Sequence, residues 1–234
     1  MRILLALGEE ALSHRGAEAT AATLATVAVG NEVIVTHGYD LQSSQALELA
    51  LRNALPGRDV VSVLTQVVVA ATDPALRDGE GYPQLVRPPK PQAIAEIRSL
   101  RTLLDAGALV ICARRGAAPL ALDDFGRLDE IEAAVDGSSV AALLARRVDA
   151  DLLVMLAGDG ESVESGIETA GRFAEATGCR AAIGGLQDAV RIAGGEAGIQ
   201  IPARGAGRSA AVRQSPGSAN AGASAGRRLG PPRR

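Results

Sequence analysis

Short apolar segments alternate along most of the chain with longer segments whose apolar residues recur at helical spacing. The short segments are rich in Val, Ile and Leu, which favours buried strands. The predicted strands cover residues 2–7, 32–36, 59–69, 108–112, 151–156 and 180–184, with an edge strand at 198–201. The predicted helices cover residues 17–28, 43–55, 92–106, 162–177 and 186–193, and a further helix begins at Ser138 or Ser139.

This alternation predicts an α/β fold: a three-layer α/β/α sandwich with a mainly parallel sheet. Residues 72–91 are rich in Asp, Gly and Pro and are predicted to form a loop. Ligands of such folds bind beyond the carboxyl ends of the strands. The segments that follow predicted strands, residues 8–12, 37–42, 113–120 and 157–166, are therefore the places where functional residues are expected.

The 234 residues divide by composition into a domain, residues 1–201, and a tail, residues 202–234. The tail has seven arginines, no acidic residue and almost no large apolar side chain, so it buries too little surface to offset the entropy of ordering. We predict that it is disordered. Contact with nucleic acid is the less favoured alternative, because the tail has no aromatic residue for base stacking.

Composition excludes several classes of protein. Hydrophobic residues make up 47% and charged residues 22%, a balance typical of a folded domain. No apolar run approaches the roughly 18 residues of a membrane span, and the first residues lack the pattern of a signal peptide, so we expect a cytoplasmic protein with no membrane partner. Two cysteines cannot form a disulfide framework or a zinc cluster, and both are expected to be buried thiols.

Several segments of the domain match motifs of one known family. They are residues 3–12 (ILLALGEEAL, against A-L-G-G-N-A-L), 34–42 (IVTHGYDLQ, against T-H-G-N-G-P-Q), 87–98 (RPPKPQAIAEIR, against S-P-x-P), 109–120 (LVICARRGAAPL, against I-V-I-C-x-G-G-G-G-I-P), 132–148 (against E-A-V-I-D-K-D and A-x-L-L-A) and 167–184 (the helix after G-S-M-G-P-K-V). Over residues 1–201 the chain therefore resembles the carbamate kinases of the amino acid kinase family. The resemblance implies the amino acid kinase fold with trimmed insertions after Gln45, around residues 76–86 and between Gly160 and Ser162.

The resemblance also implies a function. Carbamate kinases interconvert ATP plus carbamate with ADP plus carbamoyl phosphate, with Mg, in arginine metabolism, and they assemble as homodimers. Their glycine loops let backbone N–H groups approach phosphate oxygens. The positions that match substrate- or phosphate-binding motifs are Gly8, His37, Gly38, Gln42, Arg114, Arg115, Gly116 and Asp136.

Three charged positions of the family's chemistry are changed in this chain. The resemblance places two lysines at Gly137 and Gly166 and an organising aspartate at Ser138. The one lysine of the chain, Lys90, matches no catalytic position. Because phosphoryl transfer depends on positive charge around the moving group, we assign no catalytic residue and predict turnover near background. Two interpretations stay open: a phosphotransferase, and a non-catalytic homologue, or pseudokinase, that acts in binding or assembly.

Arg114 and Arg115 also allow two interpretations. They could replace the missing lysines as an anion clamp, because arginine binds phosphate through two parallel hydrogen bonds. Alternatively, they belong to a solvated loop that has lost its glycines, which is the interpretation we favour.

Two further groups of residues have a functional and a structural interpretation. Glu9 and Glu10, with Asp159 or Glu161, could bind a hard cation, but surface carboxylates are common and no metal site is predicted. His37 could act as a base, but the sequence places no nucleophile beside it, and a role in the loop scaffold is favoured.

Overall fold

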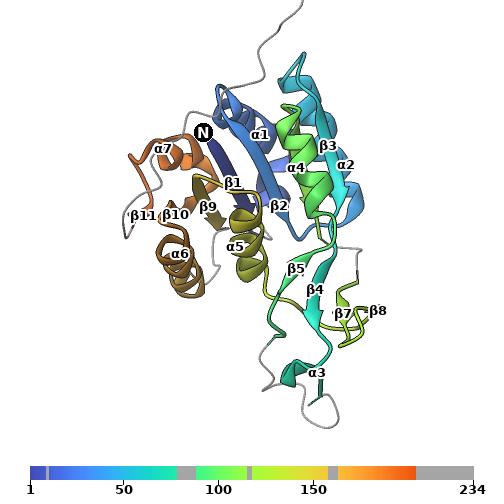
Figure 1. Cartoon of the computed structure of the whole chain (residues 1–234). Helices are drawn as coiled ribbons and strands as arrows, with labels where there is room; N and C mark the ends of the chain where they lie inside the picture. Colours follow the sequence, from blue (N-terminus) through green and yellow to red (C-terminus); the bar gives the residue numbers. More distant parts are fainter. Residues whose placement is uncertain (9–10, 78–87, 115–117, 158–162, 204–234) are drawn as a thin grey trace, which may run out of the picture.

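The main sheet has seven strands and forms the centre of the molecule (Figure 1). The computed structural model describes residues 1–8, 11–77, 88–114, 118–157 and 163–203. Across the main sheet the order is β11 (Ile199–Ile201), β10 (Arg180–Gly185), β9 (Leu152–Ala157), β1 (Arg2–Leu7), β2 (Glu32–His37), β6 (Leu109–Ala113) and β3 (Val60–Leu64). Every pair of neighbours is parallel except β10 and β11. The predicted parallel sheet and its antiparallel edge strand are thus in place.

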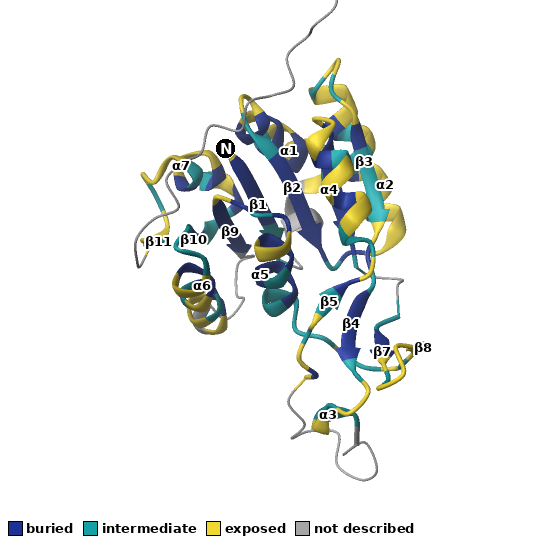
Figure 2. Cartoon of the chain, in the orientation of Figure 1, coloured by how far each residue is buried: buried dark blue, intermediate teal, exposed yellow. Residues whose placement is uncertain are grey.

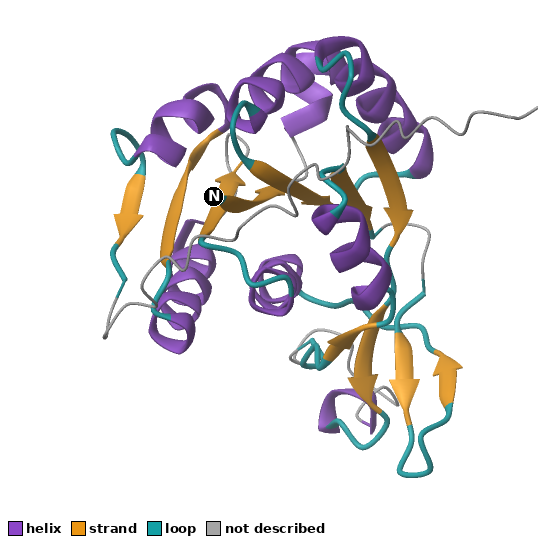
Figure 3. Cartoon of the chain, turned by 45° about the horizontal axis from the view of Figure 1, so that its top comes forward, coloured by secondary structure: helices purple, strands orange, loops and turns teal. Residues whose placement is uncertain are grey.

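Helices cover both faces of this sheet (Figure 3). One layer contains α1 (Ala11–Ala28), α2 (Leu41–Ala54) and α7 (Ala189–Gly194), which follows a short 3₁₀ turn, η1 (Leu186–Asp188); the other contains α4 (Ile97–Asp105), α5 (Gly137–Arg147) and α6 (Val163–Thr177). Successive residues of β1 alternate between the two layers: Ile3 and Leu5 pack under α1, whereas Leu4 packs on the α5 side. The buried strands of Figure 2 lie between these layers, which confirms the predicted three-layer sandwich.

A second, small sheet protrudes below the main one in Figure 1. Its order is β5 (Ala93–Ile94), β4 (Val67–Ala70), β7 (Leu120–Leu122) and β8 (Leu128–Glu130), and a short helix, α3 (Pro74–Arg77), follows β4. The single strand predicted at residues 59–69 is wrong, because β3 belongs to the main sheet and β4 to the small one. The helix predicted at residues 92–106 begins only at Ile97, since β5 precedes it.

The chain turns from one sheet to the other at Thr65 and Gln66. The Thr65 N–H donates to the Ala113 carbonyl at 2.9 Å, and the Gln66 N–H donates to a Glu96 carboxylate oxygen at 2.9 Å. These two bonds satisfy the backbone donors at the turn, so an apolar run with no Gly or Pro can still change sheets.

Aspartates, and not the predicted serines, begin two helices. The Asp40 carboxylate accepts the Ser43 N–H at 2.8 Å at the start of α2, and the Asp136 carboxylate accepts the Ser139 N–H at 2.7 Å at the start of α5. Each serine lies three residues inside the cap, where its backbone N–H is the donor that a cap must satisfy. The predicted caps at Ser43 or Ser44 and at Ser138 or Ser139 are therefore wrong.

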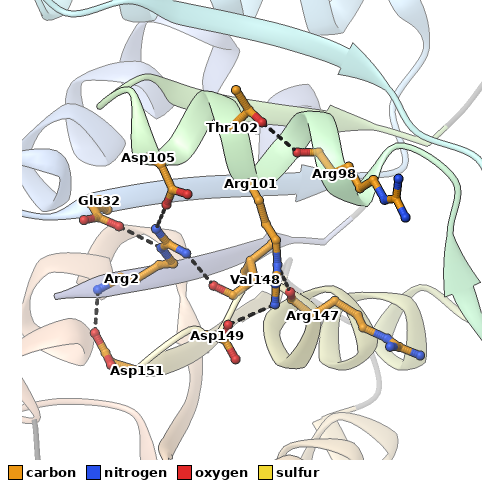
Figure 4. Close-up of polar contacts among 10 residues, drawn as sticks. All are labelled: Arg2, Glu32, Arg98, Arg101, Thr102, Asp105, Arg147, Val148, Asp149 and Asp151. Atoms are coloured by element: carbon orange, nitrogen blue, oxygen red, sulfur yellow. Dashed lines mark hydrogen bonds and ion pairs between the residues drawn. The ribbon is translucent and has the colours of Figure 1, made fainter. Parts of the chain in front are cut away.

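The amino-terminal edge of the main sheet, where its parallel strands begin, is held by Arg2 (Figure 4). The Arg2 side chain is 4% exposed. It donates to Glu32 at 2.7 Å, to Asp105 at 2.8 Å and to the Val148 carbonyl at 2.7 Å. These contacts join β1 to the start of β2, the end of α4 and the end of α5, so one guanidinium ties four elements together.

No helix in the described part of the chain is long and apolar enough to cross a membrane. The predicted disordered tail, residues 202–234, lies outside the described residues from position 204 onward.

Candidate functional site

The parallel strands end together at the opposite, carboxyl-terminal edge of the main sheet, and three of the matched positions meet there. Gly8 follows β1, His37 ends β2 and Arg114 follows β6. The Gly8 N–H donates to the Leu156 carbonyl at 2.7 Å, and the Arg114 N–H donates to the His37 carbonyl at 3.2 Å. The Tyr39 hydroxyl donates to the Gly8 carbonyl and so links the first two loops. Three positions that match binding motifs in the sequence, Gly8, His37 and Arg114, therefore lie at the same edge of the sheet.

His37 is fully buried within this edge. Its Nδ1 accepts the Tyr39 N–H at 3.1 Å, so the proton of the neutral ring lies on Nε2, which is 3.4 Å from the Ser44 hydroxyl. Burial and, to a smaller extent, the positive charge of Arg114 lower the pKa of His37 to about 4, with Asp40 opposing them in part. A neutral ring with both nitrogens directed at the protein suits the scaffold interpretation.

Arg114 and Gly137 lie against each other at the start of α5. A Cβ atom at Gly137 would stand 2.9 Å from Nη2, 3.2 Å from Nη1 and 3.4 Å from Cζ of Arg114. The guanidinium therefore occupies the space that a side chain at position 137 would enter. The resemblance places a lysine at this position, so a positive charge from the end of β6 stands next to the position where the family has its own.

Two helix amino termini at this edge already hold a carboxylate. Asp40 caps α2 and Asp136 caps α5, each through a backbone N–H that an anionic ligand could otherwise use. The Ser43 N–H also holds the pKa of Asp40 below its usual value. Asp136, a candidate binding residue, thus has a structural role in the helix cap.

The other matched positions are dispersed. Gln42 is exposed in the first turn of α2, and Gly38 is half-buried beside His37. Ser138 is half-buried in the first turn of α5, and Gly166 is buried in α6, where a Cβ would lie 3.6 Å from Ile183 Cδ1. Six residues of the sequence-based hypotheses lie outside the described residues: Glu9, Glu10, Arg115, Gly116, Asp159 and Glu161.

Neither cysteine nor lysine supplies an evident reactive group. Cys112 is fully buried, and burial raises the pKa of its thiol to about 12, which makes it unreactive. Cys179 is only half-buried, so the expectation of two buried thiols holds for Cys112 alone. Lys90 is exposed beside Asp73, beyond the far end of β4. Within the described ranges, no group of three or more His, Cys, Asp or Glu residues could hold a metal ion.

Two features of the site were missed from the sequence. Tyr39 packs its ring against His37, with centroids 4.9 Å apart, and joins the loops after β1 and β2. The contact of Arg114 with Gly137 spans two motifs that are distant in the sequence. A signal for it existed: an arginine replaces the first glycine of one matched motif while a glycine replaces the lysine of another.

Comparison with known proteins agrees with this architecture, although no protein-family model matches the chain. A carbamate kinase of Haemophilus influenzae is 27% identical over 299 aligned positions, which cover 86% of this chain and 96% of the relative. A carbamate kinase of Rhizobium meliloti is 28% identical, with 86% and 93% covered. Both alignments are longer than this chain, so many positions of the relatives have no counterpart here.

Solved structures show the same fold. A carbamate kinase of Giardia superposes with a TM-score of 0.74 at 21% identity, covering 87% of this chain and 99% of that structure. A protein of Aeropyrum pernix superposes with a TM-score of 0.71 at 20% identity, with 86% and 99% covered. With two carbamate kinases aligned along nearly their whole length, the chain is similar to carbamate kinases in sequence and shares the fold of a solved carbamate kinase.

Proposed function

We propose that this protein is a carbamate kinase homologue whose phosphotransfer between carbamoyl phosphate and ADP is near background. One observation carries the proposal: position 137, to which the resemblance assigns a lysine, has no side chain, and the Arg114 guanidinium fills the space beside it. The second matched lysine position, Gly166, is packed near Ile183 and Met155. A homodimer and a cytoplasmic location stay predictions from the sequence.

Charge explains why turnover should be low. Transfer of a phosphoryl group needs several preorganised positive groups, and loss of one such group commonly lowers the rate by about 10²–10³. Here one guanidinium stands where the resemblance implies a lysine, and carboxylates cap the neighbouring helices α2 and α5. The described residues do not fit the two-lysine phosphate cradle that the resemblance implies, because both matched lysine positions, Gly137 and Gly166, are glycines.

The direct test is ATP formation from carbamoyl phosphate and Mg-ADP, with an active carbamate kinase as the positive control. We expect a rate indistinguishable from the rate without protein, in a sample shown to be folded by circular dichroism. Binding of Mg-ADP, measured by calorimetry on the same sample, reports nucleotide affinity separately from turnover.

A second candidate function is weak carbamate kinase activity with Arg114 in place of the lysine. The contact with Gly137 favours it, because the guanidinium lies where the positive charge is needed. Turnover that is clearly above the control, and that the Arg114→Met variant loses, would establish this function instead.

Restoration of single lysines should not rescue the activity. In Gly137→Lys the new side chain meets the guanidinium at 2.9 Å and places two positive charges together, so Arg114 must move. In Gly166→Lys, position 137 is still a glycine, so the other lysine of the family's pair is missing. We expect both single variants to stay at background and a triple variant, Arg114→Gly with both lysines, to be the most active of the series. Substantial turnover by either single variant contradicts the proposal.

A further inference from the structure

The hairpin of β7 and β8, at the outer edge of the small sheet, presents large apolar side chains to solvent (Figure 2). Phe125 is 91% exposed in the turn, and Leu122 and Leu128, which lie opposite each other in the two strands, are 37% and 50% exposed. Apolar residues are often exposed singly, but these three lie close together and form a hairpin patch. The other phenylalanine of the chain, Phe173, is buried under α6.

The turn of the hairpin does not depend on the phenylalanine side chain. The Asp123 carboxylate accepts the Phe125 N–H at 2.9 Å and the Arg127 N–H at 2.8 Å. Gly126 has a φ of +80°, a left-handed conformation that favours glycine. Backbone groups, Asp123 and Gly126 therefore close the hairpin, and the exposed ring of Phe125 is open to a partner.

The charge around the hairpin patch decides which partner fits. Residues 122–132 contain one arginine, Arg127, and five carboxylates, those of Asp123, Asp124, Asp129, Glu130 and Glu132. Two copies of the chain meeting hairpin to hairpin would bring like charges together, which opposes self-association through this patch. The patch fits a positively charged segment that also offers apolar groups to Phe125.

The chain contains such a segment at residues 227–234, RRLGPPRR. Two arginine pairs flank one leucine and two prolines, and the segment has no acidic residue. Proline-rich segments favour the extended polyproline II conformation and dock on aromatic side chains. In this conformation Arg228 and Arg233 would be about 15 Å apart, at about 3.1 Å per residue. The acidic residues of the hairpin, from its turn to its base, are spread over a similar length, on the order of 10–15 Å.

The intervening chain, residues 204–226, is long enough for this contact within one molecule. Fully extended, it spans on the order of 75 Å. A domain of about 200 residues has a radius of gyration of only about 16 Å, so the segment reaches any side of it. Tethering also supplies an effective concentration on the order of 1 mM, so a weak contact is well populated.

We propose that the β7–β8 hairpin docks the arginine- and proline-containing segment 227–234 of its own chain, with Leu229 and the prolines against Phe125 and the arginines against the carboxylates. The inference needs neither nucleotide nor phosphoryl transfer. It therefore stands or falls separately from the proposed function.

The test is photo-crosslinking of the full chain with p-benzoylphenylalanine in place of Phe125. Mass spectrometry should find an intrachain crosslink to residues 227–234, in a yield that does not depend on protein concentration. The matched control has the same group in place of Leu49, which is 62% exposed on α2 beside the ion pair of Glu48 and Arg52. It should crosslink to the segment at least about fivefold less, because no surplus of negative charge attracts the arginines there. Equal yields at the two positions, or covalent dimers alone, would overturn the proposal.

Salt separates charge attraction from random collision. Raising the ionic strength from about 0.1 M to about 1 M shortens the Debye length from about 10 Å to about 3 Å, so the yield from position 125 should fall at least about threefold. Arg228→Gln with Arg233→Gln should lower it about as much, whereas Arg208→Gln with Arg213→Gln, in the intervening chain, should leave it unchanged. A yield that ignores both salt and the first pair of substitutions contradicts the proposal.

Matched variants of the domain locate the docking surface. Asp129→Asn with Glu130→Gln removes two exposed carboxylates of β8, and Glu18→Gln with Asp59→Asn makes the same changes at exposed positions elsewhere. We expect about a threefold lower yield in the first and no change in the second, because each exposed charge pair contributes little alone. The same yield in both variants assigns the contact to another surface. If the β8 variant does not fold, the arginine substitutions outside the domain still decide the question.

Discussion

The two edges of the main sheet each contain an arginine, and the two side chains are used differently. At the amino-terminal edge, Arg2 is 4% exposed and donates to two carboxylates and a carbonyl from three other elements. At the carboxyl-terminal edge, Arg114 rests on Gly137. A buried arginine thus joins several elements of the fold at one edge, whereas a half-buried arginine at the other edge lies beside a position that matches a binding motif.

The largest expected effect comes from breaking the amino-terminal cluster. Arg2→Met should lower the free energy of unfolding by about 3 kcal/mol, because it leaves the Val148 carbonyl and two carboxylates without their donor. Urea denaturation at pH 7.5 measures the loss. The control is Arg101→Met, which removes an exposed ion pair with Asp149 and should cost no more than about 1 kcal/mol. Equal losses in the two variants would contradict the assigned role of Arg2.

Acid should destabilise the carboxyl-terminal edge by protonating His37, whereas Arg2 and Arg114 keep their charge. His37 has a pKa of about 4 in the folded protein, below its ordinary value of 6.5, so the unfolded chain binds the proton more tightly between these values. Stability from the neutral ring is complete above pH 6.5 and is lost as the pH falls toward 4, by about 2 kcal/mol between pH 7.5 and pH 5.

Urea denaturation at pH 7.5, 6 and 5 measures this slope. Carboxylates also titrate in acid, so the slope of His37→Asn is subtracted from that of the parent chain. A His37→Asn variant that loses stability as steeply as the parent would show that His37 is not the group responsible.

Substitution of Arg114 tests whether the arginines at the two edges differ in their contribution to stability. Arg114→Met should lower the free energy of unfolding by less than Arg2→Met does, because Arg114 is half-buried whereas the Arg2 side chain is 4% exposed. Denaturation under the conditions used for Arg2→Met allows direct comparison. A loss as large as that of Arg2→Met would make Arg114 a structural residue too.

The smallest expected effect tests how Gly137 holds the guanidinium. Gly137→Ala keeps every charge but places a methyl group 2.9 Å from Nη2, and the end of a flexible arginine can move away. We expect the free energy of unfolding to change by less than about 0.5 kcal/mol, because the better helix propensity of alanine offsets the displacement of the guanidinium. Urea denaturation measures the change.

Gly171→Ala adds the same methyl group within α6, where nothing lies within 4 Å. It should raise the free energy of unfolding by about 0.5–1 kcal/mol, because alanine is the better helix former. An equal gain in both variants would mean that displacing the Arg114 guanidinium from Gly137 costs no stability.

The sequence predicted the main sheet well because each strand is a short apolar run between polar turns. It predicted the small sheet poorly. β7 and β8 are three residues each, and β8 is exposed along its length, so neither has a periodic pattern. The run at residues 59–69 carries no residue that marks a break, because the break is made by bonds from distant partners, Ala113 and Glu96.

The site shows the same division. The sequence predicted that Gly8, His37 and Arg114 lie at one edge of the sheet, because each ends or follows a predicted strand and parallel strands end together. The role of Asp136 as a cap was missed, since serine and aspartate are both good caps and lie within three residues of each other. The contact between Arg114 and Gly137 depends on how a loop and a helix meet, which spacing along the chain does not encode.

The small sheet is assembled from two separate excursions of the chain. β4 and β5 leave between β3 and β6, β7 and β8 leave between β6 and α5, and the parallel pairing of β4 with β7 joins them. Neither half can therefore be deleted as a unit, since its loss would expose the edge of the other half. The outer loops of the small sheet can be shortened one at a time. Removal of the whole small sheet, in contrast, requires two coordinated deletions, one on each side of β6.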